Sequence, residues 1–182
     1  EEENIKNMMV ITVDNGTSSV EEVEFLKENK IDVVITDHHM PKDTLPNCTI
    51  VNPHLTNDPI YHHLSGCGTV FKVIQIIEDA IGIKEKISPQ YLFAVALGTI
   101  ADMMPMTPEN IAFSRLGLDQ INGKNCPKTW KYFKKHLGKK KLNPLDVAWD
   151  IGPRLNACGR MGQIDKGAIL FFMNDDDDES DI

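Results

Sequence analysis

Three polar residues, Asp37-His38-His39, follow the short run Val33-Val34-Ile35-Thr36. The β-branched residues of this run favour a buried central strand, because such side chains pack well on a pleated surface. Two imidazoles beside a carboxylate could bind a divalent transition metal and orient its ligands. Two exposed histidines in a loop are the alternative interpretation, and this motif alone leaves both open.

A second acidic residue, Asp14, ends another β-branched run over residues 8–13. Between the two runs, residues 20–29 have helical spacing of apolar residues, and Ser18 or Ser19 is placed to cap that helix. A strand, a helix and a strand in this order predict two parallel strands. Asp14 and His38 should therefore leave the same edge of the sheet, where open α/β sheets place their ligands.

The next segment predicts a third strand over residues 49–51, which ends at Asn52-Pro53-His54. Two glycines, Gly66 and Gly68, then precede a helix that the spacing of apolar residues places after them. Glycines before a helix can cradle a phosphate, but close packing explains them equally well. His54, and the pair His62-His63, are either substrate contacts or ordinary loop histidines.

A largely apolar helix, opened by Ser88-Pro89, is predicted to be buried and to end near Asp102. A carboxylate at the end of a buried element needs a partner, which a metal, a helix cap or an arginine would supply. Another helix should begin near Pro108.

Eight lysines fall within residues 124–141, interleaved with Trp130, Tyr132 and Phe133. This pattern is that of either a solvated helix or a flank that contacts a phosphate backbone. Arg154 and Arg160 then stand among glycines. Guanidinium groups bind phosphate through two hydrogen bonds, and glycines permit close approach of the backbone.

Composition narrows the class of protein. The chain has 182 residues and a net charge of −8, of which six negative charges lie in residues 175–182. No apolar run approaches the roughly 20 residues that span a bilayer. The four cysteines are far apart, which indicates reduced thiols in the cytoplasm rather than a zinc cluster or disulfides.

Several motifs together resemble the DHH phosphoesterases, in particular the catalytic core of the RecJ-type exonucleases. They are Val13-Asp14-Asn15-Gly16, Asp37-His38-His39, Asn52-Pro53-His54, residues 64–68 with Phe71-Lys72, residues 98–102, residues 152–157 and Gly159-Arg160-Met161. The resemblance implies an α/β fold with a Rossmann-like parallel sheet and flanking helices, followed by a mostly helical segment. It implies a DHH catalytic domain over residues 1–122, a helical continuation over 123–174 and an acidic tail or linker helix over 175–182.

The resemblance also implies a site with two Mn²⁺ (or Mg²⁺) ions. Asp14 would bridge the ions, His38 and Asp102 would complete the shell of one, His39 would contact the scissile phosphate, and Asp37 would support the histidines. Arg154 and Arg160 would bind substrate phosphate, with Arg160 as the direct contact. Further substrate contacts are expected from the loop residues Asn52, His54, Ser65, Gly66 and Gly68.

The function implied is 5′-to-3′ exonucleolytic hydrolysis of single-stranded DNA in recombination and repair. The implied partners are single-stranded DNA, a single-strand binding protein and a helicase. Members of the family carry an earlier Asp-x-Asp motif, and no aspartate precedes Asp14 here. The chain is therefore expected to be an inactive fragment of a longer enzyme. The alternatives are a DHH phosphodiesterase acting on cyclic dinucleotides or short oligonucleotides, and a non-catalytic DHH scaffold that binds a repair partner.

Overall fold

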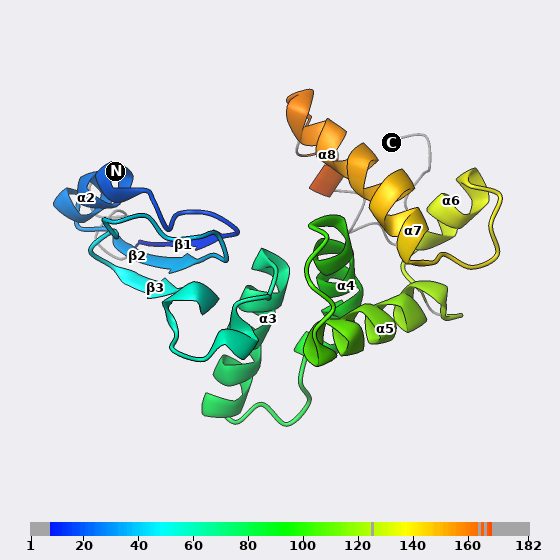
Figure 1. Ribbon diagram of the computed structural model, residues 1–182, viewed down its shortest axis with the longest axis horizontal. Helices are drawn as coiled ribbons and strands as arrows, with labels where there is room; N and C mark the ends of the chain where they lie inside the picture. The colour runs from blue at the N-terminus through cyan, green and yellow to red at the C-terminus, as the bar shows by residue number, and fades with distance from the viewer. Residues whose placement is uncertain (1–7, 125, 164, 166, 169–182) are drawn as a thin grey trace. The chain divides into compact units, whose positions relative to one another are not determined.

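The computed structural model describes residues 8–124, 126–163, 165, 167 and 168 (Figure 1). The chain forms two compact units. Glu1–Pro89 and Met104–Asn110 make up the first, and Gln90–Met103 and Ile111–Ile182 make up the second. The predicted acidic tail, residues 175–182, lies outside the described residues.

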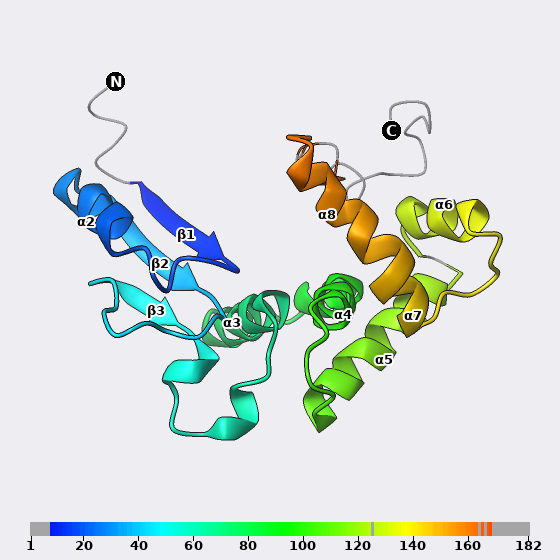
Figure 2. The ribbon, with the colours of Figure 1, turned by 45° about the horizontal axis from the view of Figure 1, so that its top comes forward.

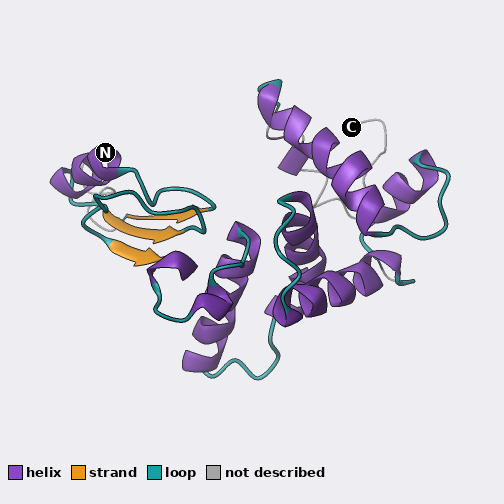
Figure 3. Cartoon of the chain, viewed as in Figure 1, coloured by secondary structure: helices purple, strands orange, loops and turns teal. Residues whose placement is uncertain are grey.

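The first unit contains a three-stranded parallel sheet in the order β1-β2-β3 (Figure 2). The strands are β1 (Met9–Val13), β2 (Asp32–Thr36) and β3 (Thr49–Val51). Ile11 lies opposite Val34, which lies opposite Thr49. Helix α2 (Val20–Glu28) joins β1 to β2. The predicted parallel α/β arrangement is confirmed (Figure 3).

Helix α2 covers one face of this sheet through Val23, which packs against Val33 and Ile35. Burial of these β-branched side chains is what fixes the strand that carries the Asp-His-His motif. The predicted serine cap is wrong, because Ser19 occupies the N-cap position without a side-chain hydrogen bond. Its ψ of 60° departs from the extended conformation in which a serine oxygen reaches the first turn of a helix.

Two short 3₁₀ turns, η1 (Pro53–Leu55) and η2 (Pro59–Tyr61), lead from β3 to helix α3 (Gly66–Ala80). The helix was expected to begin after the glycines, but Gly66 and Gly68 lie within its first turn. Ser65 supplies the cap, since its Oγ accepts a hydrogen bond of 3.1 Å from Gly68 N.

Helices make up the described part of the second unit, apart from their connections. The 3₁₀ turn η3 (Ser88–Tyr91) leads into α4 (Leu92–Ala101), and α5 (Pro108–Asn122), α6 (Lys128–His136), α7 (Pro144–Asp146), the π-helical turn η4 (Val147–Ile151) and α8 (Gly152–Arg160) follow. Its core contains Ile121, Trp130, Val147 and Ile151, all fully buried. Among the described residues, no helix has the length and apolar character to cross a membrane.

Candidate metal centre

Asp14, His38 and His39 each bring one possible ligand atom into a group in which all atoms lie within 4.8 Å of one another. His38 Nε2 is 2.9 Å from Asp14 Oδ1. This arrangement follows from the parallel pairing of β1 and β2, which end at the same edge of the sheet. The pairing extends one residue past β1, where Asp14 N donates a hydrogen bond to Thr36 O. The two motifs predicted to share an edge do so.

The backbone of Asp14 adopts a φ of 65°, a left-handed conformation that is unusual for a residue other than glycine. Its carboxylate lies against Gly66, where an added Cβ would stand 2.6 Å from Asp14 Cγ. The first turn of α3 thus approaches the carboxylate closely, and the positive end of a helix dipole favours a negative charge there. Strained residues of this kind concentrate at functional sites.

Asp37 lies beneath the histidines and is 2% exposed. Its Oδ1 accepts hydrogen bonds from His38 N (2.7 Å) and His39 N (3.2 Å), and it lies 2.7 Å from His39 Nδ1, while Oδ2 accepts one from Thr17 N (3.0 Å). Burial by itself raises the pKa of Asp37, but the hydrogen bonds from His39, Thr17 and His38 outweigh it and hold the pKa well below its usual range. Asp37 is therefore an ionised carboxylate that orients the loop.

A buried pair, Thr17 and Asn52, completes this support and was not singled out for it from the sequence. Asn52 Nδ2 donates to Thr17 Oγ1 and to His39 O, both at 2.9 Å, and Asn52 Oδ1 accepts from His54 N at 2.9 Å. Asn52 was expected to contact substrate. Its buried position instead ties β3 to the loop that carries His39.

The loop histidines form a second group. The rings of His54 and His62 have centroids 5.2 Å apart, and His62 Nε2 lies 3.1 Å from Thr56 O. Burial lowers the pKa of His54, and positive charge on His62, His38 or His63 lowers it further. His54 therefore favours the neutral imidazole.

The remaining predicted residues belong to the second unit. Asp102 follows α4 at its C-cap and is exposed, so the expectation of a buried carboxylate there is wrong. The helix itself is largely buried, but it ends at Ala101, and Asp102 lies just beyond that end. Arg154 and Arg160 are also exposed, and both lie on α8. Six residues of helix separate them by about 9 Å along the axis, which suits contacts with different phosphates.

The donor set fits a divalent cation such as Mn²⁺, which accepts mixed carboxylate and imidazole ligands. The fit also rests on the geometry of the chain itself, namely the strained Asp14, the glycine that makes room for its carboxylate and the buried Asp37 network. Within the described residues, this is the one group of three or more acidic, histidine or cysteine side chains close enough to share an ion.

Comparison with known proteins gives consistent matches. Residues 3–99 match the DHH family, N-terminal domain. The single-stranded-DNA-specific exonuclease RecJ of Haemophilus influenzae is 35% identical over 92% of this chain, and that of Bacillus subtilis is 34% identical over 95%. The chain spans 31% and 22% of those two proteins.

Solved structures extend the similarity to the fold. RecJ from Thermus thermophilus in complex with Mn²⁺ superposes with a TM-score of 0.81 at 30% identity, covering 92% of this chain and 25% of that one. A second exonuclease RecJ structure bound to manganese gives a TM-score of 0.78 at 30% identity, covering 91% of this chain and 42% of the other.

Proposed function

This chain belongs to the DHH family, and we propose from that premise that it carries part of the active site of a metal-dependent 5′-to-3′ exonuclease acting on single-stranded DNA. The observation that carries the proposal is the juxtaposition of Asp14 with His38, 2.9 Å apart above the buried Asp37. RecJ exonucleases that are 30–35% identical to the chain, some of them solved with manganese, support it.

In this proposal Asp14 and His38 hold the metal, and Asp102 is the further carboxylate that the family resemblance assigns to the same shell. Two bound Mn²⁺ or Mg²⁺ ions would supply an activated water and neutralise charge on the phosphodiester. The ionised Asp37 accepts from Nδ1–H of the His39 ring, and in the positively charged form of that ring Nε2–H would donate to a phosphate oxygen of the substrate. His39 is well placed for that contact, because its side chain is 64% exposed.

The guanidinium groups of the two arginines of α8 could bind further phosphates of the DNA strand. Arg160 in the last turn of α8 would contact a substrate phosphate directly. Arg154 Nη1 already donates to Asp150 O, so its second role is to bind a neighbouring phosphate with its remaining donors. Of the predicted substrate loop, the partly buried His54 would be the remaining contact with the substrate. Ser65, Gly66 and Gly68 are buried at the start of α3 and would act by shaping that turn.

The biological setting is proposed from the same relatives. The enzyme would act in recombination and repair in the cytoplasm, together with a single-strand binding protein and a helicase. Residues 1–122 would form its DHH catalytic domain, and residues 123–174 a helical continuation in which Arg154, Arg160 and the neighbouring glycines form the phosphate-contact motif.

An assay of the full-length protein tests this function. With Mn²⁺ and a 5′-phosphorylated single-stranded oligonucleotide, mononucleotides should appear from the 5′ end. His38→Ala should abolish the release, whereas His136→Ala on α6, an exposed histidine remote in sequence, should leave it unchanged. Hydrolysis of cyclic dinucleotides in place of the oligonucleotide would assign the chain to another branch of the family. A protein inert on all of these substrates would be a scaffold.

A further inference from the structure

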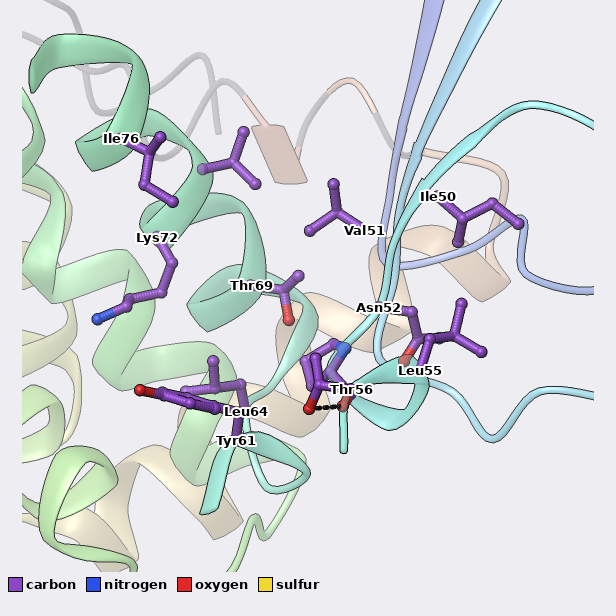
Figure 4. A pocket seen from close by; sticks show the side chains of 12 residues that line it. Ile50, Val51, Asn52, Leu55, Thr56, Tyr61, Leu64, Thr69, Lys72 and Ile76 are labelled. Carbon is purple, nitrogen blue, oxygen red and sulfur yellow. Dashed lines mark hydrogen bonds between the residues drawn. The ribbon is translucent and has the colours of Figure 1, made fainter. Parts of the chain in front are cut away.

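A cavity of about 400 Å³ lies between β3 and α3 in the first unit (Figure 4). Apolar side chains form most of its wall. They are Ile50, Val51, Leu55, Leu64, Val73 and Ile76. Tyr61 lines it as well and is 42% exposed. Its volume falls in the range of pockets that enclose small organic ligands, which are mostly apolar with a few placed polar groups.

One polar group of this cavity has no partner among the described residues. Thr69 is 2% exposed, and its Oγ1 makes no hydrogen bond. Figure 4 shows this oxygen directed toward the part of the cavity where Tyr61 and Thr56 lie. A buried hydroxyl without a partner costs free energy, which a ligand with a donor or acceptor at that point would recover.

Apart from the hydroxyl of the exposed Tyr61, the other polar side chains of the wall are already engaged. Asn52 is bonded to Thr17, His39 and His54. Thr56 Oγ1 donates within its own turn, to Pro53 O or Asp58 O. Lys72 contributes its stem and directs its Nζ to Glu109 at 2.8 Å. Thr69 Oγ1 is therefore the buried polar atom through which this mostly apolar cavity could hydrogen-bond a ligand.

The cavity shares a wall with the metal centre. Asn52 lines the cavity, and its Nδ2 also donates a hydrogen bond to His39 O, so one residue of the wall is bonded to the loop that would contact the scissile phosphate. Ligands of parallel α/β sheets gather at this carboxyl edge of the strands.

We propose that this cavity is a subsite for a nucleobase of the substrate, an assignment that rests on the proposed nuclease function. A base has two apolar faces and a polar edge, which matches aliphatic walls and a single buried hydroxyl. Tyr61 supplies an aromatic face at the rim for stacking. Because a hydroxyl both donates and accepts, Thr69 can pair with the edge of any base, and the subsite should tolerate all sequences. An apolar protein side chain would fill the same space but leave Thr69 unpaired.

The experiment is a titration of the 182-residue chain, with its isoleucine, leucine and valine methyl groups labelled for NMR, in EDTA. The probes are deoxyadenosine, which has a base but no phosphate, deoxyribose 5-phosphate, which has no base, and toluene. Deoxyadenosine should shift the methyl resonances of Ile50, Val73 and Ile76, and deoxyribose 5-phosphate should not. Thr69→Val keeps the shape and removes the hydroxyl, and should weaken deoxyadenosine binding about five- to tenfold.

Ser114→Ala is the matched control. Ser114 Oγ is also buried without a hydrogen bond, but it lies on α5 and outside the cavity, so its removal should leave deoxyadenosine binding unchanged. Val73→Phe should fill the chamber and abolish binding.

The proposal is overturned if deoxyadenosine leaves those methyl groups unshifted, as expected if another protein segment occupies the cavity. Equal binding to Thr69→Val, or toluene binding as tightly as deoxyadenosine, would also overturn it and leave only an apolar hole. The titration with deoxyadenosine involves neither metal nor phosphate, so its failure leaves the proposed nuclease function standing. Failure of the chain to bind Mn²⁺ would in turn leave a positive titration unaffected.

Discussion

Gly66→Ala tests whether α3 shapes the metal centre. The added Cβ would lie 2.6 Å from Asp14 Cγ and 2.7 Å from Asp14 Cβ, well inside van der Waals contact. Either the Asp14 carboxylate moves away from His38, or the first turn of α3 shifts. Overpacking of this size typically costs about 1–3 kcal/mol.

The two responses have different readouts. Displacement of Asp14 should lower Mn²⁺ affinity at least about tenfold, which corresponds to roughly 1.4 kcal/mol. A shift of α3 should instead lower the free energy of unfolding by about 1–3 kcal/mol. Calorimetric titration with Mn²⁺ and urea denaturation measure both quantities on one preparation.

Gly159→Ala is the matched control, since Gly159 lies in helix α8 and an added Cβ there meets nothing within 4 Å. It should raise stability by about 0.5–1 kcal/mol, because alanine loses less backbone entropy in a helix than glycine does. It should leave Mn²⁺ affinity unchanged. If Gly66→Ala binds Mn²⁺ and unfolds as the parent chain does, the close approach of α3 to Asp14 has no role in the site.

Two further predictions concern buried carboxylates. Asp37→Asn keeps the size of the side chain but places an amide among the N–H donors of Thr17, His38 and His39. It should lower the free energy of unfolding, measured in urea, by about 2–3 kcal/mol. An unchanged midpoint and slope of the urea transition would contradict the support assigned to Asp37. For Glu78, the hydrogen bond from the Ser88 hydroxyl lowers the pKa, against the effect of burial, and the N–H groups of Ser88 and Ile87 lower it further. A carboxylate with a lowered pKa stabilises the fold above its ordinary pKa, here 4.5, and that stabilisation is lost as the pH falls below it. Glu78→Gln should therefore flatten the fall of stability between about pH 5 and pH 3, while the exposed Glu85→Gln should not; equal pH profiles for both variants would be the contrary result.

The sequence was sufficient to place Asp14 beside His38. The spacing of the apolar residues predicts a strand, a helix and a strand, and the two strands of such a unit are parallel. Both therefore end at the same edge of the sheet, where the two motifs follow them. Asp37 could also be assigned its supporting role, although only through the family resemblance. In the structure, Asp37 Oδ1 accepts a hydrogen bond from His38 N and lies 2.7 Å from His39 Nδ1, and its supporting role stays a prediction.

The contacts of Thr17 and Asn52 could not be predicted in the same way. These residues are 35 apart in the chain and meet only because β3 lies beside β2, and no local pattern signals such a hydrogen bond. For Gly66 the sequence left a phosphate cradle and close packing equally open, and the structure shows close packing, because an added Cβ would lie 2.6 Å from Asp14 Cγ. Gly152 also lies in a closely packed helix, because a Cβ there would lie 3.2 Å from Ala101 Cβ.

Binding of Mn²⁺ to the 182-residue chain tests the central claim most directly. Paramagnetic broadening by Mn²⁺ should remove the imidazole NMR signals of His38 and His39 first and spare that of His136, which stacks on Tyr132 in α6. Asp14→Asn and His38→Ala should each abolish this selective broadening. Equal broadening of all histidines in the parent chain, or selective broadening that survives both substitutions, would contradict a metal centre at the edge of the sheet.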